Sequence, residues 1–125
     1  MSRLPFRVLV ADDDPTVGLL MQAALTEPDF VVTVVEEGLA ALTAFRAGTF
    51  DLVLLDVEMP GMDGFEVSAA IRATHGRSIP IMLITSHCDP DFLARAESMA
   101  LGHIAKPVQW QALAGLLLNR LSTAG

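Results

Sequence analysis

Four short apolar runs in this sequence each end on a residue that can take part in phosphate or metal chemistry. The runs, with the residues that follow them, are 8–11 before Asp12 and Asp13, 52–55 before Asp56, 81–84 before Thr85, and 103–105 before Lys106. An apolar run of this length is typical of a buried strand with both faces covered. In an open parallel sheet, ligands bind beyond the carboxyl ends of the strands. The pattern therefore predicts one pocket that collects these carboxylates, the hydroxyl and the lysine.

Helix signals lie between the apolar runs, so strands and helices alternate along the chain. We expect strands at residues 8–11, 31–35, 50–55, 80–84 and 103–105. Capping residues, prolines and apolar residues at helical spacing predict helices that begin at Asp14-Pro15, near Leu39, after Asp63-Gly64, at Asp89-Pro90 and after Pro107. This alternation predicts an α/β fold with a doubly wound five-stranded parallel sheet and helices on both faces.

Length and composition fit one globular domain. We place it at residues 1–125, with a core at about 6–121, because 52% hydrophobic and 18% charged residues can build a sizeable interior. No apolar stretch approaches the ~20 residues of a membrane span, and no signal peptide is apparent. Cys88 is the only cysteine, so we expect a reducing, cytoplasmic location and a small loop residue rather than a redox switch. The net charge of −7 disfavours a nucleic-acid surface.

Asp56 is the residue best placed to act as a nucleophile. It follows a predicted buried strand and precedes a loop that contains Pro60-Gly61. Carboxylates form acyl phosphates in phosphoryl-transfer proteins. Because a carboxylate that attacks an anionic phosphoryl group needs neutralisation, a hard divalent cation is implied, and Mg²⁺ (or Mn²⁺) fits oxygen ligands. Lys106 is the only lysine among eight basic residues, and its compact ammonium suits a phosphoryl oxygen.

Four motifs together resemble the receiver domain of response regulators in two-component signalling. They are VLVADDDP at 8–15, LVLLDVEMPGMDG at 52–64, ITS at 84–86 and KP at 106–107. The resemblance covers nearly the whole chain and implies the flavodoxin-like strand order 2-1-3-4-5. It also implies a phosphorelay protein that takes a phosphoryl group onto Asp56, with Mg²⁺, from a sensor histidine kinase or a histidine phosphotransfer protein. Such a protein catalyses only its own phosphorylation and dephosphorylation.

The same resemblance implies a metal site among the acids. Asp13 and Asp56 would coordinate the ion directly, the backbone carbonyl of Glu58 would add a ligand, and Asp12 would act through water. The plainer alternative for residues 12–14 is a solvated turn in which Asp14 caps a helix. Glu58 also lies two residues after the phosphoacceptor, where side chains of the family tune how long the phosphoryl group survives.

A second set of residues is implied to bind the phosphoryl group. Lys106 would pair with one phosphoryl oxygen, and the Thr85 hydroxyl would bond another once Asp56 is modified. The backbone N–H groups of Ser86 and Val57 would contribute further hydrogen bonds. His87 lies two residues after Thr85 and is either a second tuning residue or a plain loop residue.

Two positions depart from the family pattern. His103 stands three residues before Lys106, where the family usually has a tyrosine or phenylalanine that swings inward when the threonine engages the phosphoryl group. A histidine is smaller and titrates near neutrality, so His103 is either a modified switch or a half-exposed polar residue of the last strand. Met99 stands where a glycine commonly ends the fourth helix, so we expect a different turn there.

The last expected helix is apolar nearly all round. Leu113, Leu117 and Leu121 fill its core-facing stripe, which leaves Leu116 and Leu118 without a place in it. By resemblance, the fourth helix, last strand and last helix form the surface that switches, and on it we place His103, Trp110 and Leu116. An exposed apolar patch marks an interaction site. We therefore expect a homodimer through this face, or contact with a C-terminal output domain; residues 106–113 are similar to receivers joined to cyclic-di-GMP domains.

Two other protein classes compete with this interpretation. A Mg²⁺-dependent phosphatase of the haloacid-dehalogenase type also uses an aspartate nucleophile, a Thr or Ser and a Lys. That class needs a second aspartate two residues after the nucleophile, where this chain has Glu58, and an acidic pair after its lysine. A flavodoxin needs a hydroxyl-rich phosphate loop after the first strand, where this chain has three aspartates.

Overall fold

Five strands and five helices alternate along residues 5–124, the part of the chain that this computed structural model describes. The strands are β1 (Phe6–Ala11), β2 (Phe30–Val35), β3 (Leu52–Asp56), β4 (Ile81–Thr85) and β5 (Gly102–Ala105). The helices are α1 (Pro15–Ala24), α2 (Gly38–Ala47), α3 (Gly64–His75), α4 (Pro90–Ser98) and α5 (Trp110–Ala124). The predicted alternation of strands and helices is confirmed.

All five strands pair in parallel in one sheet, in the order β2-β1-β3-β4-β5. This is the predicted order 2-1-3-4-5. The central strands β3 and β4 are buried along their whole length, because helices cover both faces of the sheet. The register sets Asp56 opposite Ile84, and Thr85 opposite Ala105. The carboxyl ends of β3, β4 and β5 therefore lie next to one another at one edge of the sheet.

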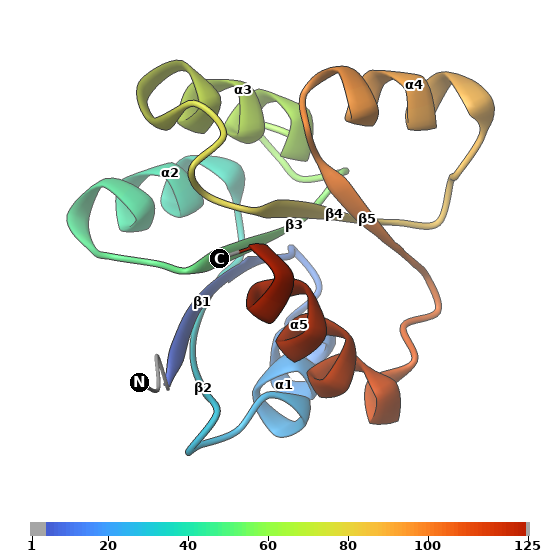
Figure 1. Cartoon of the computed structure of the whole chain (residues 1–125). Helices are drawn as coiled ribbons and strands as arrows, with labels where there is room; N and C mark the ends of the chain where they lie inside the picture. The colour runs from blue at the N-terminus through green and yellow to red at the C-terminus, as the bar shows by residue number, and fades with distance from the viewer. Residues whose placement is uncertain (1–4, 125) are drawn as a thin grey trace.

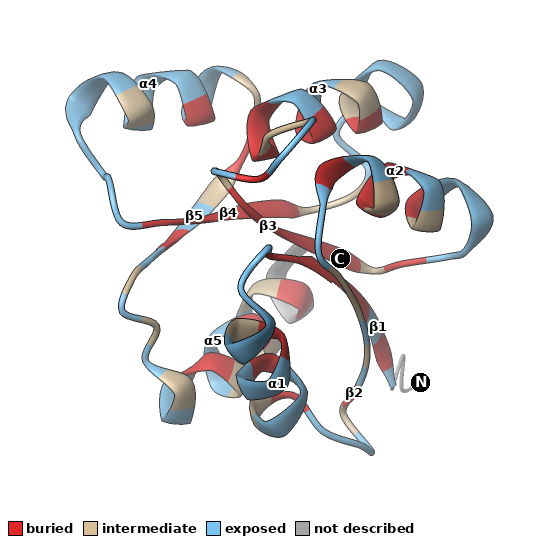
Figure 2. Cartoon of the chain, turned by 180° about the vertical axis from the view of Figure 1, so that it is seen from behind, coloured by how far each residue is buried: buried red, intermediate tan, exposed pale blue. Residues whose placement is uncertain are grey.

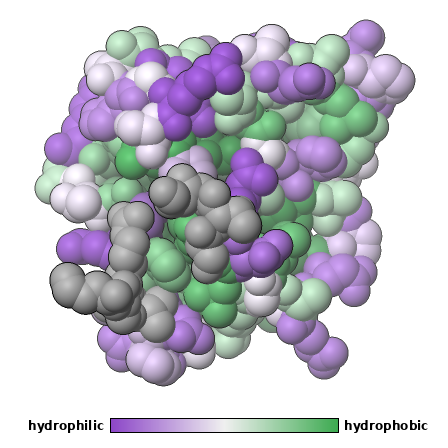
Figure 3. Space-filling model, viewed as in Figure 1, coloured by the Kyte–Doolittle hydropathy of each residue, from purple (hydrophilic) through white to green (hydrophobic). Residues whose placement is uncertain are grey.

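The helices form a layer on each face of the sheet. Figure 1 shows α2, α3 and α4 on one side and α1 and α5 on the other. Two apolar clusters fill the space between these layers and the sheet, one under α2–α4 and one under α1 and α5. Figure 2 shows that buried residues line the central strands and the inward sides of the helices. In the view of Figure 3, hydrophilic residues gather on the outer side of the helices, whereas apolar residues show between the two layers.

Side-chain caps start three of the helices at the residues that the sequence predicts. Asp14 accepts a hydrogen bond from the N–H of Thr16, 2.9 Å away, at the start of α1. Asp63 and Glu66 form a reciprocal capping box at the start of α3. Asp89 caps α4, with Pro90 in the first helical turn. These caps fix where α1, α3 and α4 begin after the carboxyl ends of the strands that precede them.

The turn after α4 differs from a glycine-ended helix, as the sequence predicts. Met99 ends α4, and Ala100 takes the left-handed conformation with φ 57°. Arg72 of α3 donates hydrogen bonds to the carbonyls of Met99 (3.1 Å) and Ala100 (3.0 Å). The same guanidinium donates to the carbonyls of Gly76 and Ile79. It thereby joins the ends of α3 and α4.

Two strand ends differ slightly from their expected positions. The strands β3 and β4 end on Asp56 and Thr85 themselves, one residue later than expected. The backbone of each of these residues therefore belongs to the sheet rather than to the loop that follows. Among the residues described, none of the helices is both long enough and apolar enough to cross a bilayer.

Candidate functional site

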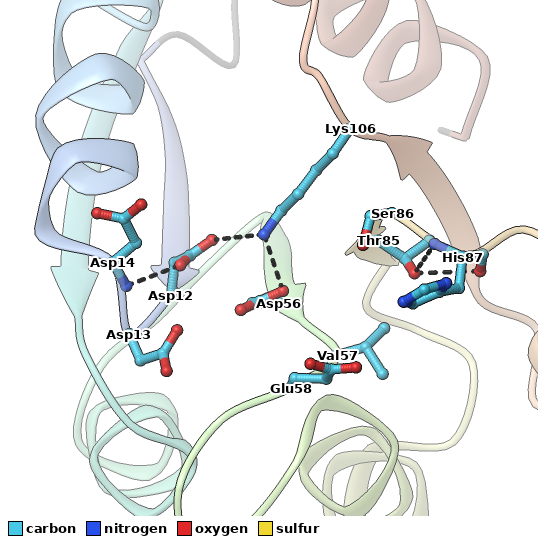
Figure 4. Close-up of a pocket in the computed structure, with 10 residues that line it drawn as sticks. All are labelled: Asp12, Asp13, Asp14, Asp56, Val57, Glu58, Thr85, Ser86, His87 and Lys106. Carbon is cyan, nitrogen blue, oxygen red and sulfur yellow. Dashed lines mark hydrogen bonds and ion pairs between the residues drawn. The ribbon is translucent and has the colours of Figure 1, made fainter.

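A cavity of about 290 Å³ opens at the carboxyl end of the sheet, where the sequence predicts the pocket. Its lining residues come from the ends of β1, β3, β4 and β5 and the loops after them: Asp12, Asp13, Asp14, Asp56, Val57, Glu58, Thr85, Ser86, His87 and Lys106. Figure 4 shows the carboxylates on one side of the cavity and the Thr85–His87 loop on the other. The structure thus brings the predicted acids, hydroxyl and lysine together.

Asp12 is held rigidly at the end of β1. Its Oδ1 atom accepts a hydrogen bond of 2.9 Å from the N–H of Asp14. Its Oδ2 atom is buried and accepts no hydrogen bond from any residue that the structure describes. Lys106 Nζ lies 3.7 Å from that oxygen. A buried carboxylate oxygen with an open coordination position needs a cation beside it.

Lys106 reaches into the cavity from the end of β5 (Figure 4). Its Nζ atom donates a hydrogen bond of 3.2 Å to Oδ1 of Asp56. Burial by itself would lower the pKa of this ammonium, but the negative charges of Asp12 and Asp56 outweigh burial and raise it above its ordinary value. Lys106 is therefore a permanent cation at neutral pH.

Asp56 is buried at the end of β3, and its pKa is raised to about 6. Burial is the main cause, and the negative charge of Asp12 adds to it, whereas Lys106 lowers the pKa. Burial also raises the pKa of Asp12, against the hydrogen bond from Asp14. The two buried carboxylates therefore carry more negative charge than one lysine can offset.

The acids fit a divalent metal ion. Asp12, Asp13 and Asp56 each offer a carboxylate oxygen, and these three oxygens lie within 4.8 Å of one another. The donor set contains oxygen alone, which is the preference of Mg²⁺ and Mn²⁺. The open Oδ2 position of Asp12 supports the same conclusion. Glu58 lies at the edge of the cavity away from Lys106, with its side chain exposed (Figure 4).

The opposite wall of the cavity is formed by the end of β4 and the loop after it. The Thr85 hydroxyl donates to the carbonyl oxygen of His87 (3.1 Å) and accepts from the N–H of His87 (2.9 Å). Ser86 and His87 are exposed and line the cavity. Thr85 is thus bonded within its own loop rather than to the acids.

The backbone N–H of Val57, which is predicted to bind the phosphoryl group, has a partner within the unmodified protein. The N–H of Val57 donates to the carbonyl oxygen of Ile84 at 3.2 Å, as part of the ladder between β3 and β4. It is therefore engaged in the sheet and is not a free donor toward the cavity. The sequence pattern could not reveal this, because it does not show where the ladder between β3 and β4 ends.

The remaining predicted residues lie outside the cavity. His103 and Leu116 line a separate groove of about 550 Å³ between β5 and α5, which also includes Lys106. The ring of His103 lies edge-to-face against Phe92 of α4, with 6.2 Å between the ring centroids. Trp110 is half-buried against the core and does not line the groove.

The last helix is less exposed than its sequence suggests. The side chains of Leu113, Leu117 and Leu121 are buried, as predicted. Leu118 is half-buried and packs on the same core, so the expectation that it has no place there is wrong. Leu116 is 50% exposed and is the large apolar side chain of this helix that remains open to solvent among the residues described.

Residues 8–117 match the family model of the response regulator receiver domain. The chain belongs to this family. The matched segment contains every cavity residue described above, so the predicted resemblance is confirmed. The haloacid-dehalogenase alternative is not favoured.

Two relatives illustrate the proteins in which similar receiver domains occur. Sensor histidine kinase GacS of Pseudomonas protegens is 39% identical over 123 residues, which cover 94% of this chain and 13% of that protein. DNA-binding response regulator MtrA of Mycolicibacterium smegmatis is 36% identical over 122 residues, which cover 97% of this chain and 53% of that protein. This receiver domain therefore spans about half of MtrA and a small part of GacS.

Solved receiver structures share the fold. Chemotaxis protein CheY4 of Vibrio cholerae superposes with a TM-score of 0.83 at 27% identity, covering 91% of this chain and 97% of that one. The signal receiver domain of a histidine kinase from Syntrophus aciditrophicus gives a TM-score of 0.82 at 28% identity, covering 94% of this chain and 91% of that one. The receiver architecture is therefore shared along nearly the whole chain.

Proposed function

We propose that this receiver domain carries a phosphoryl group on Asp56. The observation that supports the proposal best is the position of Lys106, with Nζ 3.2 Å from Oδ1 of Asp56 and 3.7 Å from Oδ2 of Asp12. A single ammonium is aimed at the end of a buried strand, against a cluster of carboxylates. Such an arrangement stabilises part of the negative charge that is added when one of those carboxylates gains a phosphoryl group.

The donor is a phosphohistidine on a sensor histidine kinase or on a histidine phosphotransfer protein. A carboxylate oxygen of Asp56 attacks the phosphorus atom, and the bond between phosphorus and the histidine nitrogen breaks. The nitrogen keeps the electron pair, so a donor ring that is protonated on its other nitrogen is left as a neutral imidazole, and Asp56 becomes an acyl phosphate. Lys106 then pairs with a phosphoryl oxygen in place of Oδ1.

Asp12, Asp13 and Asp56 would hold Mg²⁺ or Mn²⁺, with the backbone carbonyl of Glu58 as a further ligand and Asp12 acting through water. When bound, the ion neutralises charge on the phosphoryl oxygens during transfer. Asp13 is exposed and can turn toward the ion, whereas Asp12 is fixed by the N–H of Asp14.

The conformational switch begins with an exchange of hydrogen-bond partners at Thr85. Its hydroxyl leaves the carbonyl oxygen of His87 and binds a phosphoryl oxygen, and the N–H of Ser86 binds another. Because the loop after Thr85 leads into α4, the exchange shifts the start of that helix. His103 lies against Phe92 of α4, so the shift reaches the surface of α4, β5 and α5.

Loss of the phosphoryl group is a hydrolysis. A water molecule attacks phosphorus, the bond between phosphorus and the Asp56 oxygen breaks, inorganic phosphate leaves with the oxygen of the water, and the carboxylate is regenerated. Glu58 and His87 both line the cavity, from the loops after β3 and β4, so their side chains set how easily water reaches phosphorus. The protein catalyses only these changes of its own state.

The partner of the switched surface is a second copy of the domain, which meets it through α4, β5 and α5 with Leu116 and Trp110 at the contact. A C-terminal output domain is the other candidate, and MtrA, of which this chain spans about half, is named a DNA-binding response regulator. Residues 1–125 form a single domain in this proposal. The cyclic-di-GMP output suggested by residues 106–113 stays a prediction, as does the absence of direct nucleic-acid contact.

Phosphorylation by acetyl phosphate tests the proposal. Intact mass should rise by one phosphoryl group in the presence of Mg²⁺ and should not rise with a chelator or in Asp56→Asn. A rise of undiminished extent in Asp56→Asn would refute the assignment. Rapid turnover of p-nitrophenyl phosphate, with no stable modified chain, would instead favour a phosphatase.

A further inference from the structure

The first residue of α2 touches the backbone of the loop that follows the phosphoacceptor. A Cβ atom at Gly38 would overlap the carbonyl oxygen of Met62 and would stand 2.8 Å from both the carbonyl carbon and the Cβ of that residue. Real Cβ atoms do not approach backbone so closely, and backbone cannot swing aside as a side-chain tip can. Only a hydrogen atom fits between α2 and the loop.

This loop connects Asp56 to α3 and carries Glu58. It is fixed at its two ends, because the N–H of Gly64 donates to the carbonyl of Val57 at 2.9 Å. At that end the backbone is also tightly packed, since a Cβ at Gly64 would stand 2.6 Å from the carbonyl oxygen of Asp56. In the middle of the loop, the backbone of Met62 has Gly38 as a close neighbour from a distant part of the chain.

The start of α2 is suited to hold a carbonyl group. Glu37 precedes the helix but makes no side-chain capping hydrogen bond. The first N–H groups of a helix carry partial positive charge, which favours a carbonyl oxygen beside them. The Met62 carbonyl lies against the Cα of Gly38, the first residue of that helix, and the half-buried Met62 side chain packs on the same core as α2.

We propose that Gly38 is a positioning residue for the phosphoacceptor site. By allowing α2 to abut Met62, it sets how far the loop stands from Asp13 and Asp56, and therefore where the backbone carbonyl of Glu58 lies. This inference rests on the proposed metal site and extends it to α2, which contributes no residue to the cavity. Gly38→Ala pushes the loop outward and separates the Glu58 carbonyl from the acids.

Calorimetric titration of the whole chain with Mg²⁺ tests the proposal. We expect Gly38→Ala to weaken Mg²⁺ binding about tenfold, the size typical of changes in residues that support metal ligands. Backbone amide chemical shifts of residues 57–63 should also change in the metal-free protein. The matched control is Gly48→Ala at the other end of α2, where a Cβ would stand 3.2 Å from the Phe50 ring. It should leave Mg²⁺ affinity unchanged, whatever its effect on melting temperature.

A second variant keeps the test decisive if Gly38→Ala does not fold. Leu39 is 59% exposed in the first turn of α2, so Leu39→Gly loosens that turn without a clash and with little loss of core. It should weaken Mg²⁺ binding two- to threefold, whereas Arg46→Gly in the last turn should not. Unchanged affinity in a folded Gly38→Ala, or in Leu39→Gly, would overturn the inference. If the unaltered chain bound no Mg²⁺, the proposed metal site itself would fail.

Discussion

The Lys106 ammonium donates a hydrogen bond of 3.2 Å to the Asp56 carboxylate, although the two residues are 50 positions apart in the sequence. The sheet creates this contact, because β3 and β5 flank β4 and end at the same edge. The pair lies beside a second buried carboxylate, Asp12, that Lys106 reaches only at 3.7 Å. The metal-free site therefore has excess negative charge, which destabilises the folded protein at neutral pH.

Asp56→Asn should stabilise the metal-free protein at neutral pH. The pKa of Asp56 is about 6 in the folded chain and near 3.8 when unfolded, so between these values only the folded state holds the proton. The free energy of unfolding therefore falls as pH rises through this range, by about 3 kcal/mol at most. Chemical unfolding with a chelator present should show a gain of about 2 kcal/mol in Asp56→Asn at pH 7.5, and almost none near pH 4.

The matched control for this titration is Asp13→Asn. Asp13 is exposed, so its charge costs less than that of a buried carboxylate, and the gain should be smaller. A gain in Asp56→Asn that is equal at pH 4 and pH 7.5 would show that packing, rather than the charge of Asp56, is responsible.

Asp13→Ala should remove most of the Mg²⁺ affinity without unfolding the protein. The side chain is exposed, and its loss relieves repulsion among the three carboxylates whose oxygens lie within 4.8 Å of one another. Titration calorimetry should show a loss of at least about tenfold in affinity, while the melting temperature of the metal-free protein stays the same or rises. Unchanged affinity would exclude Asp13 as a ligand.

Lys106→Arg should keep phosphorylation of Asp56 but lose the conformational response. The guanidinium is planar and wide, so it cannot act as a point charge between Asp56 and Asp12 and then follow a phosphoryl oxygen. Amide chemical shifts of α4 and β5 should change on phosphorylation in the unaltered chain and not in the variant. Wild-type shift changes in Lys106→Arg would show that any cation suffices.

Leu116→Lys should weaken self-association of the phosphorylated domain. Leu116 is 50% exposed and lines the groove that contains His103, and burying the exposed half of a leucine contributes about 1 kcal/mol. Sedimentation with beryllofluoride, which mimics the phosphoryl group, should show a dimer that Leu116→Lys reduces. Leu19→Lys on α1, where the leucine is 68% exposed, is the matched control and should dimerise normally. A chain that stays monomeric both with and without beryllofluoride would refute the dimer proposal.

The fold was largely predictable because its signals are local. Apolar runs without alternation marked strands covered on both faces, and Asp14, Asp63 and Asp89 marked helix starts that the structure confirms. The strand order came from the family resemblance, not from the runs themselves. The carboxyl ends of β3 and β4 lie one residue beyond the predicted ends, because a carboxylate or hydroxyl at a strand end looks like a turn residue.

The sequence predicts the site residues that stand at strand ends. It does not predict contacts that depend on packing between distant parts of the chain. The convergence of Asp12, Asp56 and Lys106 follows from parallel strands that end at one edge. The pairing of the Val57 N–H with Ile84, and the place of Leu118 in the core, depend on neighbours that a single sequence does not reveal. The sequence around Gly38 does not indicate its proposed role, because that role depends on the backbone of Met62, 24 residues away.

Reductive trapping of the phosphorylated chain tests the central claim most directly. The chain is treated with acetyl phosphate and Mg²⁺, the acyl phosphate is reduced with borohydride, and the modified residue is located by peptide mass spectrometry. We predict that Asp56 alone is converted to homoserine and that omission of Mg²⁺ abolishes the product. Trapping at Asp12 or Asp13, or an unmodified Asp56 in a chain that has gained a phosphoryl group, would contradict the account.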